Sequence, residues 1–211
     1  MPLLTPLSRD QIPSDLHGLW DQCEALAPEF RHLWSTMAHS PAIFRAIWGG
    51  LLELKRTSPV AARHFELAIV TVSTLTACNY CVSHHTPLVA QTGCSSEQLD
   101  ALLGLRLDAL AEDYDFPLRP GFNEVDSLVI DLAYFVVWSG TYAPQHGVYP
   151  RHVHQLKHRL VTRLKTYFTP QQIEELLWRI TQCVSFNWHN DFLELDIETG
   201  VQPLLTVASE A

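Results

Sequence analysis

Apolar residues recur at intervals of three and four along most of the chain, which is the spacing of an amphipathic helix. Two proline-containing polar stretches, 112–121 and 139–150, interrupt the pattern as a loop and a linker. No two-residue hairpin turn joins alternating strands. We therefore expect an all-α fold of about eight or nine helices, in one domain over residues 1–211. The expected helices cover 14–27, 29–37, 41–56, 59–77, 79–92, 96–111, 123–138, 151–167 and 170–190.

One segment, LAIVTVSTLT at 67–76, fits both regular structures. Its β-branched residues favour a strand on propensity alone. The preceding Ser58-Pro59 is typical of a helix start, with a capping hydroxyl before a proline at the first helical position. No other segment would pair with a strand here. We expect a helix that is apolar all round and therefore buried.

Composition narrows the possible partners. Charged residues make up 18% of the chain, below the usual roughly 25%, so we expect some apolar surface to meet another subunit of a homo-oligomer. The net charge of −9, without a basic run, argues against nucleic acid and anionic membranes. No run of about 18 apolar residues predicts a membrane span. The N-terminus does not resemble a secretory signal, and we expect a cytoplasmic protein.

The strongest chemical signal is the segment ELAIVTVSTLTACNYCVSHH at 66–85, which contains the only C-x-x-C of the sequence. Cys78 and Cys81 are spaced so that a disulfide can close with little backbone movement. Cys81 falls in the first turn of an expected helix, where the helix dipole favours a thiolate. His84 and His85 follow at i+3 and i+4, within reach of the Cys81 sulfur. This arrangement predicts redox chemistry.

Two other interpretations of this segment stay open. The cysteines could be buried side chains beside incidental histidines. Cys78, Cys81 and His85 could also supply three zinc ligands, although no second C-x-x-C offers the fourth ligand of a structural site. Five cysteines in a chain of this size are an odd and sparse set, which argues against a disulfide scaffold. We expect Cys23, Cys94 and Cys183 to be small buried hydrophobic residues.

Glu66 is a lone carboxylate in an apolar helix, where an unpaired charge is costly. It therefore predicts a specific partner or a raised pKa suited to proton transfer. An ordinary salt bridge, to Arg63 or to another helix, is the alternative. In one straight helix, the Cα atoms of Glu66 and Cys78 would lie about 18 Å apart. For Glu66 to join the thiols, the chain must bend after Ala77.

The combination Glu66-x11-Cys78-Asn79-Tyr80-Cys81-x3-His85 resembles the signature of the AhpD-like alkylhydroperoxidase proteins, in the wider carboxymuconolactone decarboxylase superfamily. The specific match runs over about 40–93, and Thr169-Pro170 with the later SFNWHNDF resembles the last helix of many members. The resemblance implies an all-α fold that assembles as a homo-oligomer, as a trimer, hexamer or dimer. Tyr80 stands where the best-known members have a histidine, and His84 is a hypothetical replacement.

The resemblance also implies a chemistry. Cys81 would attack a hydroperoxide and become a sulfenic acid, and Cys78 would resolve it to a disulfide. His85 and Glu66 would form the proton relay that activates Cys81. An external dithiol would return the electrons, and no bound cofactor or metal is implied. A protein disulfide reductase, a non-catalytic redox switch and a decarboxylase-type enzyme are the alternatives, and the C-x-x-C argues against the last.

Two weaker clusters complete the search for chemistry. His152, His154 and His158 include one pair at i, i+4 that could bind a metal, but a solvated helix face is the better interpretation. The residues at 188–191 could line a pocket, but ordinary packing with exposed polar tips is favoured.

Overall fold

The computed structural model describes residues 2–204, in which all regular secondary structure is helical and no strand occurs. Nine helices of seven or more residues and one short helix in this part agree with the all-α prediction. Three short 3-10 turns lie near the N-terminus, at Arg9–Gln11, Ser14–Leu16 and Pro28–Phe30. The α-helices are α1 (His17–Leu26), α2 (Arg31–Met37), α3 (Pro41–Thr57), α4 (Ala62–Leu75), α5 (Asn79–Gln91), α6 (Ser96–Leu103), α7 (Glu124–Gly140), α8 (Tyr142–Gln145), α9 (Pro150–Leu164) and α10 (Pro170–Phe192).

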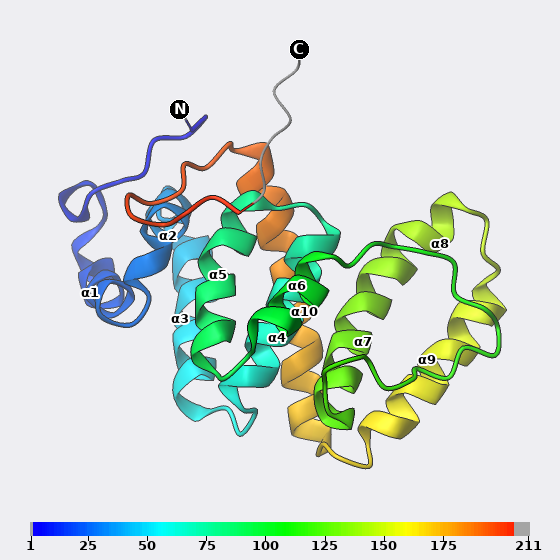
Figure 1. Ribbon diagram of the computed structural model, residues 1–211. Helices are drawn as coiled ribbons and strands as arrows, with labels where there is room; N and C mark the ends of the chain where they lie inside the picture. Colours follow the sequence, from blue (N-terminus) through cyan, green and yellow to red (C-terminus); the bar gives the residue numbers. More distant parts are fainter. Residues whose placement is uncertain (1, 205–211) are drawn as a thin grey trace.

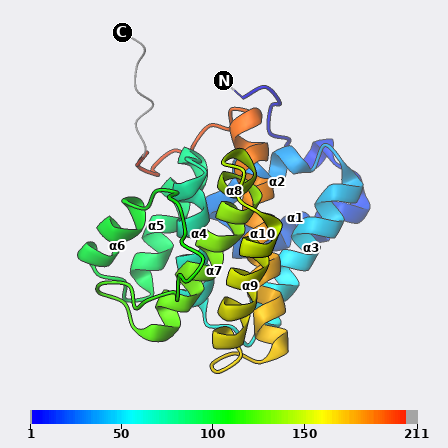
Figure 2. The ribbon, with the colours of Figure 1, turned by 90° about the vertical axis from the view of Figure 1, so that its right-hand side faces the viewer.

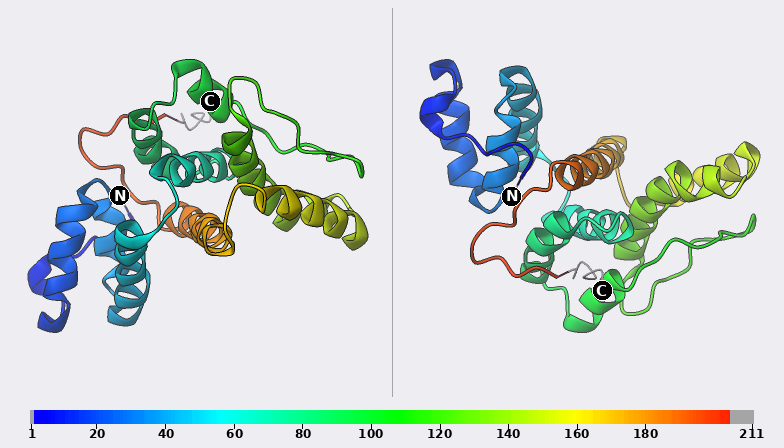
Figure 3. Two further views of the ribbon diagram at one scale, coloured as in Figure 1. Left: turned by 90° about the horizontal axis from the view of Figure 1, so that it is seen from below. Right: turned by 90° about the horizontal axis from the view of Figure 1, so that it is seen from above.

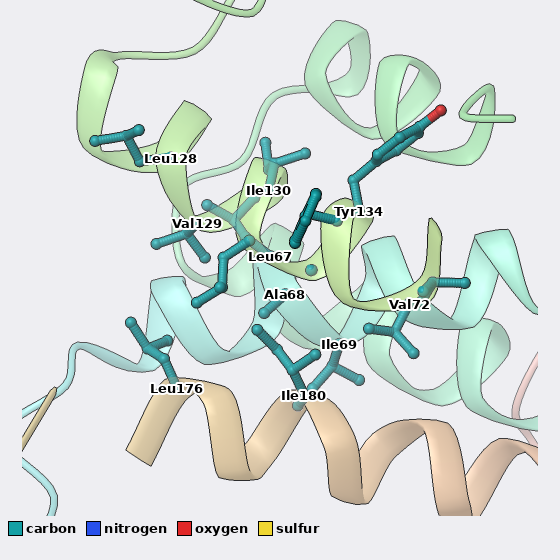
Figure 4. Close-up of a cluster of buried hydrophobic side chains, with 14 of the residues drawn as sticks. Leu67, Ala68, Ile69, Val72, Leu128, Val129, Ile130, Tyr134, Leu176 and Ile180 are labelled. Atoms are coloured by element: carbon teal, nitrogen blue, oxygen red, sulfur yellow. The ribbon is translucent and has the colours of Figure 1, made fainter. Parts of the chain in front are cut away.

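Helix α4 lies at the centre of the larger hydrophobic core. Residues 67–74 are all buried, as expected of a helix that is apolar all round. The helix packs against α5, α7 and α10. Figure 4 shows Leu67 and Ile69 of α4 between Ile130 of α7 and Ile180 of α10. The β-branched segment is therefore a helix because tertiary burial on several sides overrides its strand propensity.

The N-terminal helices α1, α2 and α3 form a second core cluster. Trp20 and Trp34 meet edge to face with ring centroids 4.6 Å apart, and Phe44 packs beside them. These helices lie on one side of α10, whereas α7 and α9 lie on the other (Figures 1 and 3). Helix α9 packs on α7, and α8 and α9 cover the outer face of that end (Figure 2). The cluster also includes Cys78 and Cys81, so the thiols lie where the two cores meet.

Three expected boundaries were wrong. Helix α4 begins at Ala62, because Ser58 closes α3 and its hydroxyl donates to the Glu175 carboxylate instead of capping α4. The helix expected over 96–111 ends at Leu103, and the following apolar side chains pack on the core without helical backbone. The linker expected over 139–150 contains α8.

Within residues 2–204, no helix is both long and apolar enough to cross a membrane. The expectation of a single domain over the whole chain stays a prediction.

Candidate active site

A tight turn between α4 and α5 places the chemistry. Ala77 has a φ of 56°, in the left-handed region that non-glycine residues rarely adopt. The Cys78 N–H donates to the Ser73 carbonyl at 3.0 Å and the Ala77 N–H to the Thr74 carbonyl at 3.2 Å, which is the Schellman pattern of a helix end. The turn sends α5 back along α4, and the two helices pack together. This is the bend that Glu66 needs in order to reach the thiols.

Glu66 and His85 form a buried hydrogen-bonded pair. The distance from Nδ1 of His85 to Oε2 of Glu66 is 2.7 Å, and their side chains are only 8% and 18% exposed. The imidazole also stacks on the Phe30 ring at 4.7 Å, a contact that no sequence signal indicated. When Nδ1 carries the hydrogen donated to Glu66, Nε2 is free to accept or return a proton. The pair can therefore serve as a proton relay.

The two thiols are free, buried and hydrogen-bonded to each other. Cys78 is the N-cap of α5, and its Sγ accepts the Cys81 backbone N–H at 3.5 Å. The hydrogen bond from the Cys81 thiol lowers the pKa of Cys78 despite burial. The same hydrogen bond, followed by burial, raises the pKa of Cys81 well above its usual range. The lowered pKa expected at Cys81 is therefore found at Cys78, mainly because the Cys81 thiol donates to it and in smaller part because Cys78 caps the helix.

Cys81 nevertheless faces an open space. A cavity of about 210 Å³ is lined by Cys81, His85 and Glu66 together. Its other walls are mostly apolar and come from the Pro28–Phe30 turn, α2, α3, α4 and α10. They include Phe30, Leu33, Trp48, Leu52, Ile69 and Phe186. Three of the four candidate residues therefore share one cavity, and Cys78 lies behind Cys81 as its hydrogen-bond partner.

Helix α10 adds two residues that the sequence did not place beside the thiols. Asn190 donates from Nδ2 to the Cys81 sulfur at 3.3 Å. Cys183 lines the cavity and lies 3.5 Å from Oγ of Ser73, and burial raises its pKa to about 11. Cys183 is buried as expected, but it lies beside the thiol pair. Asn190 lies within the 188–191 stretch that was weighed as a possible pocket wall, whereas Trp188 is 57% exposed.

His84 points to a different cluster. Its Nδ1 lies 2.6 Å from the Tyr80 carbonyl, and its Nε2 lies 2.6 Å from Oε2 of Glu198. The Tyr80 hydroxyl donates to Oε1 of the same carboxylate at 2.8 Å. Glu198 belongs to the C-terminal strap, residues 193–204, which returns past α2 to α5 (Figure 1). Both nitrogens of His84 are thus engaged away from the cavity, which leaves the relay to His85.

The donor geometry gives no metal site in residues 2–204, since no three or more His, Cys, Asp or Glu side chains converge there. The zinc interpretation of Cys78, Cys81 and His85 therefore has no geometric support. The rings of His154 and His158 lie 4.2 Å apart on α9 without a third ligand.

The family model described as the carboxymuconolactone decarboxylase family matches residues 40–112, which include both thiols, His85 and Glu66. The matched segment runs from the start of α3 through α6. The family resemblance seen in the C-x-x-C segment is thereby confirmed. No curated protein matches the chain.

Solved structures extend the likeness over nearly the whole chain. An uncharacterised peroxidase-related protein from Silicibacter sp. TM1040 is 13% identical, with a TM-score of 0.64 and coverage of 93% of each chain. The debrominase Bmp8, as a cysteine-to-alanine variant in complex with 2,3,4-tribromopyrrole, is 18% identical, with a TM-score of 0.63 over 94% of this chain and 93% of that chain. The apo form of Bmp8 is also 18% identical, with a TM-score of 0.61 over 93% of this chain and 92% of that chain. These likenesses show the AhpD-like fold.

Proposed function

We propose that this protein is a thiol-dependent peroxidase in which Cys78 and Cys81 reduce an organic hydroperoxide. The observation that carries the proposal is the single cavity lined by the Cys81 thiol and by the His85–Glu66 pair. A nucleophile and a proton relay thus face the space where a substrate would bind. The family match and the peroxidase-related neighbour support the same chemistry.

The first step requires a thiolate at Cys81. When the pair has lost one proton, the lowered pKa of Cys78 and the raised pKa of Cys81 favour the charge on Cys78, and the two sulfurs share the remaining proton. Transfer of that proton within the hydrogen bond leaves a thiolate on Cys81 and a thiol on Cys78. In this mechanism His85 takes up the other thiol proton, and its partner Glu66 stabilises the imidazolium that forms. Asn190 donates to the Cys81 sulfur and favours its charged form.

The Cys81 thiolate attacks the outer peroxide oxygen, and the O–O bond breaks. His85 protonates the departing alkoxide, which leaves as an alcohol. The Cys78 sulfur then attacks the Cys81 sulfenic acid, and the proton it loses leaves with the hydroxyl as water. The balance is one dithiol and one hydroperoxide to one disulfide, one alcohol and one water. An external dithiol must reduce the disulfide before the next turnover.

Reductive dehalogenation is a second candidate. It is favoured by the apolar cavity beside the dithiol and by the likeness to the debrominase Bmp8. In that reaction the dithiol would become a disulfide, and the carbon–bromine bond would be replaced by carbon–hydrogen with release of bromide and a proton. Both candidates oxidise the same thiol pair, so substrate trials can separate them.

The test begins with the reduced protein and one equivalent of cumene hydroperoxide, with thiol loss followed over time and peptides mapped by mass. We expect rapid loss of two thiols and a crosslink between Cys78 and Cys81. A crosslink that forms only over hours would favour a disulfide reductase or a redox switch. Two unreacted thiols would overturn the redox proposal.

A trapping experiment assigns the roles. With a sulfenic-acid reagent present, Cys78→Ser should be labelled at Cys81, because the resolving thiol is missing. Cys81→Ser should remain unlabelled at Cys78, which lies behind the cavity. Cys94→Ser is the matched control at a buried cysteine away from the cavity, and it should form the crosslink at the normal rate. Labelling of Cys78 in Cys81→Ser would reverse the two roles.

A further inference from the structure

Arg179 lines the cavity from α10 with a guanidinium group that lacks a partner. Its Nη1 atom is buried and has no hydrogen-bond partner among residues 2–204, and no ion pair of that part of the chain includes Arg179. Guanidinium nitrogens out of contact with water normally donate to an oxygen, because an unsatisfied buried cation is costly. The group therefore has spare donors at the wall of a binding space.

Two carboxylates near Arg179 are engaged elsewhere. Glu175 lies one turn earlier on α10, the usual position of a helical partner. It instead accepts hydrogen bonds from Ser58 and from Nε2 of Gln171, the latter at 2.9 Å. Glu66, on the cavity wall, is bonded to His85 at 2.7 Å. Arg179 thus forms an ion pair with no carboxylate of residues 2–204, Glu29 on the same cavity wall included.

The second cation on the cavity wall is already used. Lys55 is exposed at the rim, and its Nζ donates to the Leu26 carbonyl. Arg179 is therefore the cationic side chain of the cavity wall that has donors to offer. A planar guanidinium can bind both oxygens of a carboxylate at once, which an ammonium group cannot do.

The size and lining of the cavity restrict the rest of the ligand. A volume of about 210 Å³ exceeds the roughly 150 Å³ that accommodates benzene in an apolar protein cavity, but it is below the usual range of drug-sized pockets. Trp48 and Phe186 stack near each other on one wall, with ring centroids 6.3 Å apart. One ring with small substituents, or a short branched chain, fits such a space.

We infer that the cavity selects small apolar molecules that carry a carboxylate, which Arg179 binds while the apolar body extends toward Cys81. The inference rests on the proposed function for its reactive group: the substrate would be the hydroperoxide of a small carboxylic acid. Arg179 is then a residue that determines specificity. The thiol pair and His85 carry out the reaction.

The test uses two unreactive probes of the same shape, 4-isopropylbenzoate and the neutral 4-isopropylbenzamide. Binding to the reduced full-length protein is measured by calorimetry. Because a charge-assisted bidentate contact is strong, we expect the carboxylate to bind at least about tenfold more tightly than the amide. Arg179→Met should abolish this preference and leave amide binding intact, and Arg179→Lys should keep part of it.

Lys55→Met is the matched control, since it removes a cation from the same cavity and should keep the preference. Arg179→Met should unfold at the same temperature as the wild type or higher, because it removes a charge that makes no internal bond. Equal binding of the two probes by the wild type, or a preference retained in Arg179→Met, would overturn the inference.

The probes do not react, so this result is independent of turnover. In Cys78→Ser/Cys81→Ser the carboxylate preference should persist. If the wild type prefers the carboxylate probe but forms no Cys78–Cys81 crosslink with peroxide, the binding site stands and the peroxidase proposal fails. If the wild type forms the crosslink but binds both probes equally, the peroxidase proposal stands and the binding site fails.

Discussion

At the scale of single residues, the hydrogen bond between the two thiols separates their pKa values. Cys78 and Cys81 are chemically alike and equally buried, but only Cys78 caps α5 and accepts a backbone N–H. The hydrogen bond from the Cys81 thiol, and to a smaller extent this backbone N–H, lowers the pKa of Cys78, whereas donating that bond raises the pKa of Cys81. Cys81, and not Cys78, lines the cavity. The thiol with the lower pKa is therefore not the thiol that faces the cavity.

Glu66 is the residue whose replacement tests the relay most directly. Glu66→Gln keeps the side-chain shape but removes the charge that stabilises the His85 imidazolium. We expect the first-order rate of thiol loss with cumene hydroperoxide to fall by roughly 100-fold. Glu29→Gln, which changes a carboxylate on the same cavity wall without a hydrogen-bond partner, is the control and should react normally. An unchanged rate in Glu66→Gln would remove Glu66 from the mechanism.

At the scale of elements, the turn between α4 and α5 holds a residue with a backbone conformation that suits glycine better. Ala77 has a φ of 56° in the turn, whereas Gly93, after the end of α5, has a φ of 86°. Both positions end a helix beside the site segment. The two turns therefore offer opposite substitutions at comparable positions.

Ala77→Gly should stabilise the protein by about 0.5–1 kcal/mol, because relief of the left-handed strain exceeds the added freedom of the unfolded chain. Gly93→Ala should destabilise it by about 1 kcal/mol. A Cβ at Gly93 would meet no atom within 4 Å, so that effect is purely conformational. Chemical denaturation of both variants checks the signs. A loss of stability in Ala77→Gly would show that the turn needs the alanine methyl group.

At the scale of the whole molecule, the C-terminal strap ties the N-terminal layer to α5. Glu198 accepts the backbone N–H of His32 in α2 at 2.7 Å and lies 2.6 Å from Nε2 of His84 in α5. Burial by itself would raise the pKa of Glu198, but the hydrogen bonds from His84 and His32 together hold it below its usual value. A single carboxylate thus joins segments that are distant in the sequence, next to the thiol pair.

Glu198→Gln should lower the unfolding free energy at pH 7 by about 1.5–3 kcal/mol. Because the folded-state pKa of Glu198 is depressed, its contribution is complete above the unfolded pKa and is lost as pH falls through the folded pKa. The difference between wild type and variant should therefore shrink on acidification, which denaturation at a series of pH values measures. Glu194→Gln, on an exposed part of the same strap, should show no difference at any pH. A difference that does not change with pH would contradict the charged role of Glu198.

The assembly of the molecule stays a prediction. The low charge content predicts a homo-oligomer, and large aromatic side chains on α10 are exposed: Trp178, Trp188 and Phe192. The external dithiol reductant is likewise a prediction from the chemistry of a C-x-x-C.

The sequence by itself determined the helical fold, the location of the reactive segment and the family that this segment resembles. These follow from local information: apolar spacing, capping residues, and the arrangement of Cys78, Cys81 and His85 within a few residues. Even the β-branched helix α4 was predictable, since no strand partner existed for it. The start of α4 was predicted wrongly because the Ser58 hydroxyl, a typical helix cap, instead contacts Glu175 of the distant helix α10.

Only the tertiary structure decided which side chains meet. The turn at Ala77 brings Glu66 to His85. It depends on a left-handed backbone conformation, which an alanine in the sequence does not predict. His84 and His85 are neighbours in sequence, but their separation of about 100° around the helix sends one to the strap and the other to the cavity. Arg179 and Asn190 reach the site from α10 through packing alone. Contacts between distant segments depend on the shape of the whole core, which no local pattern encodes.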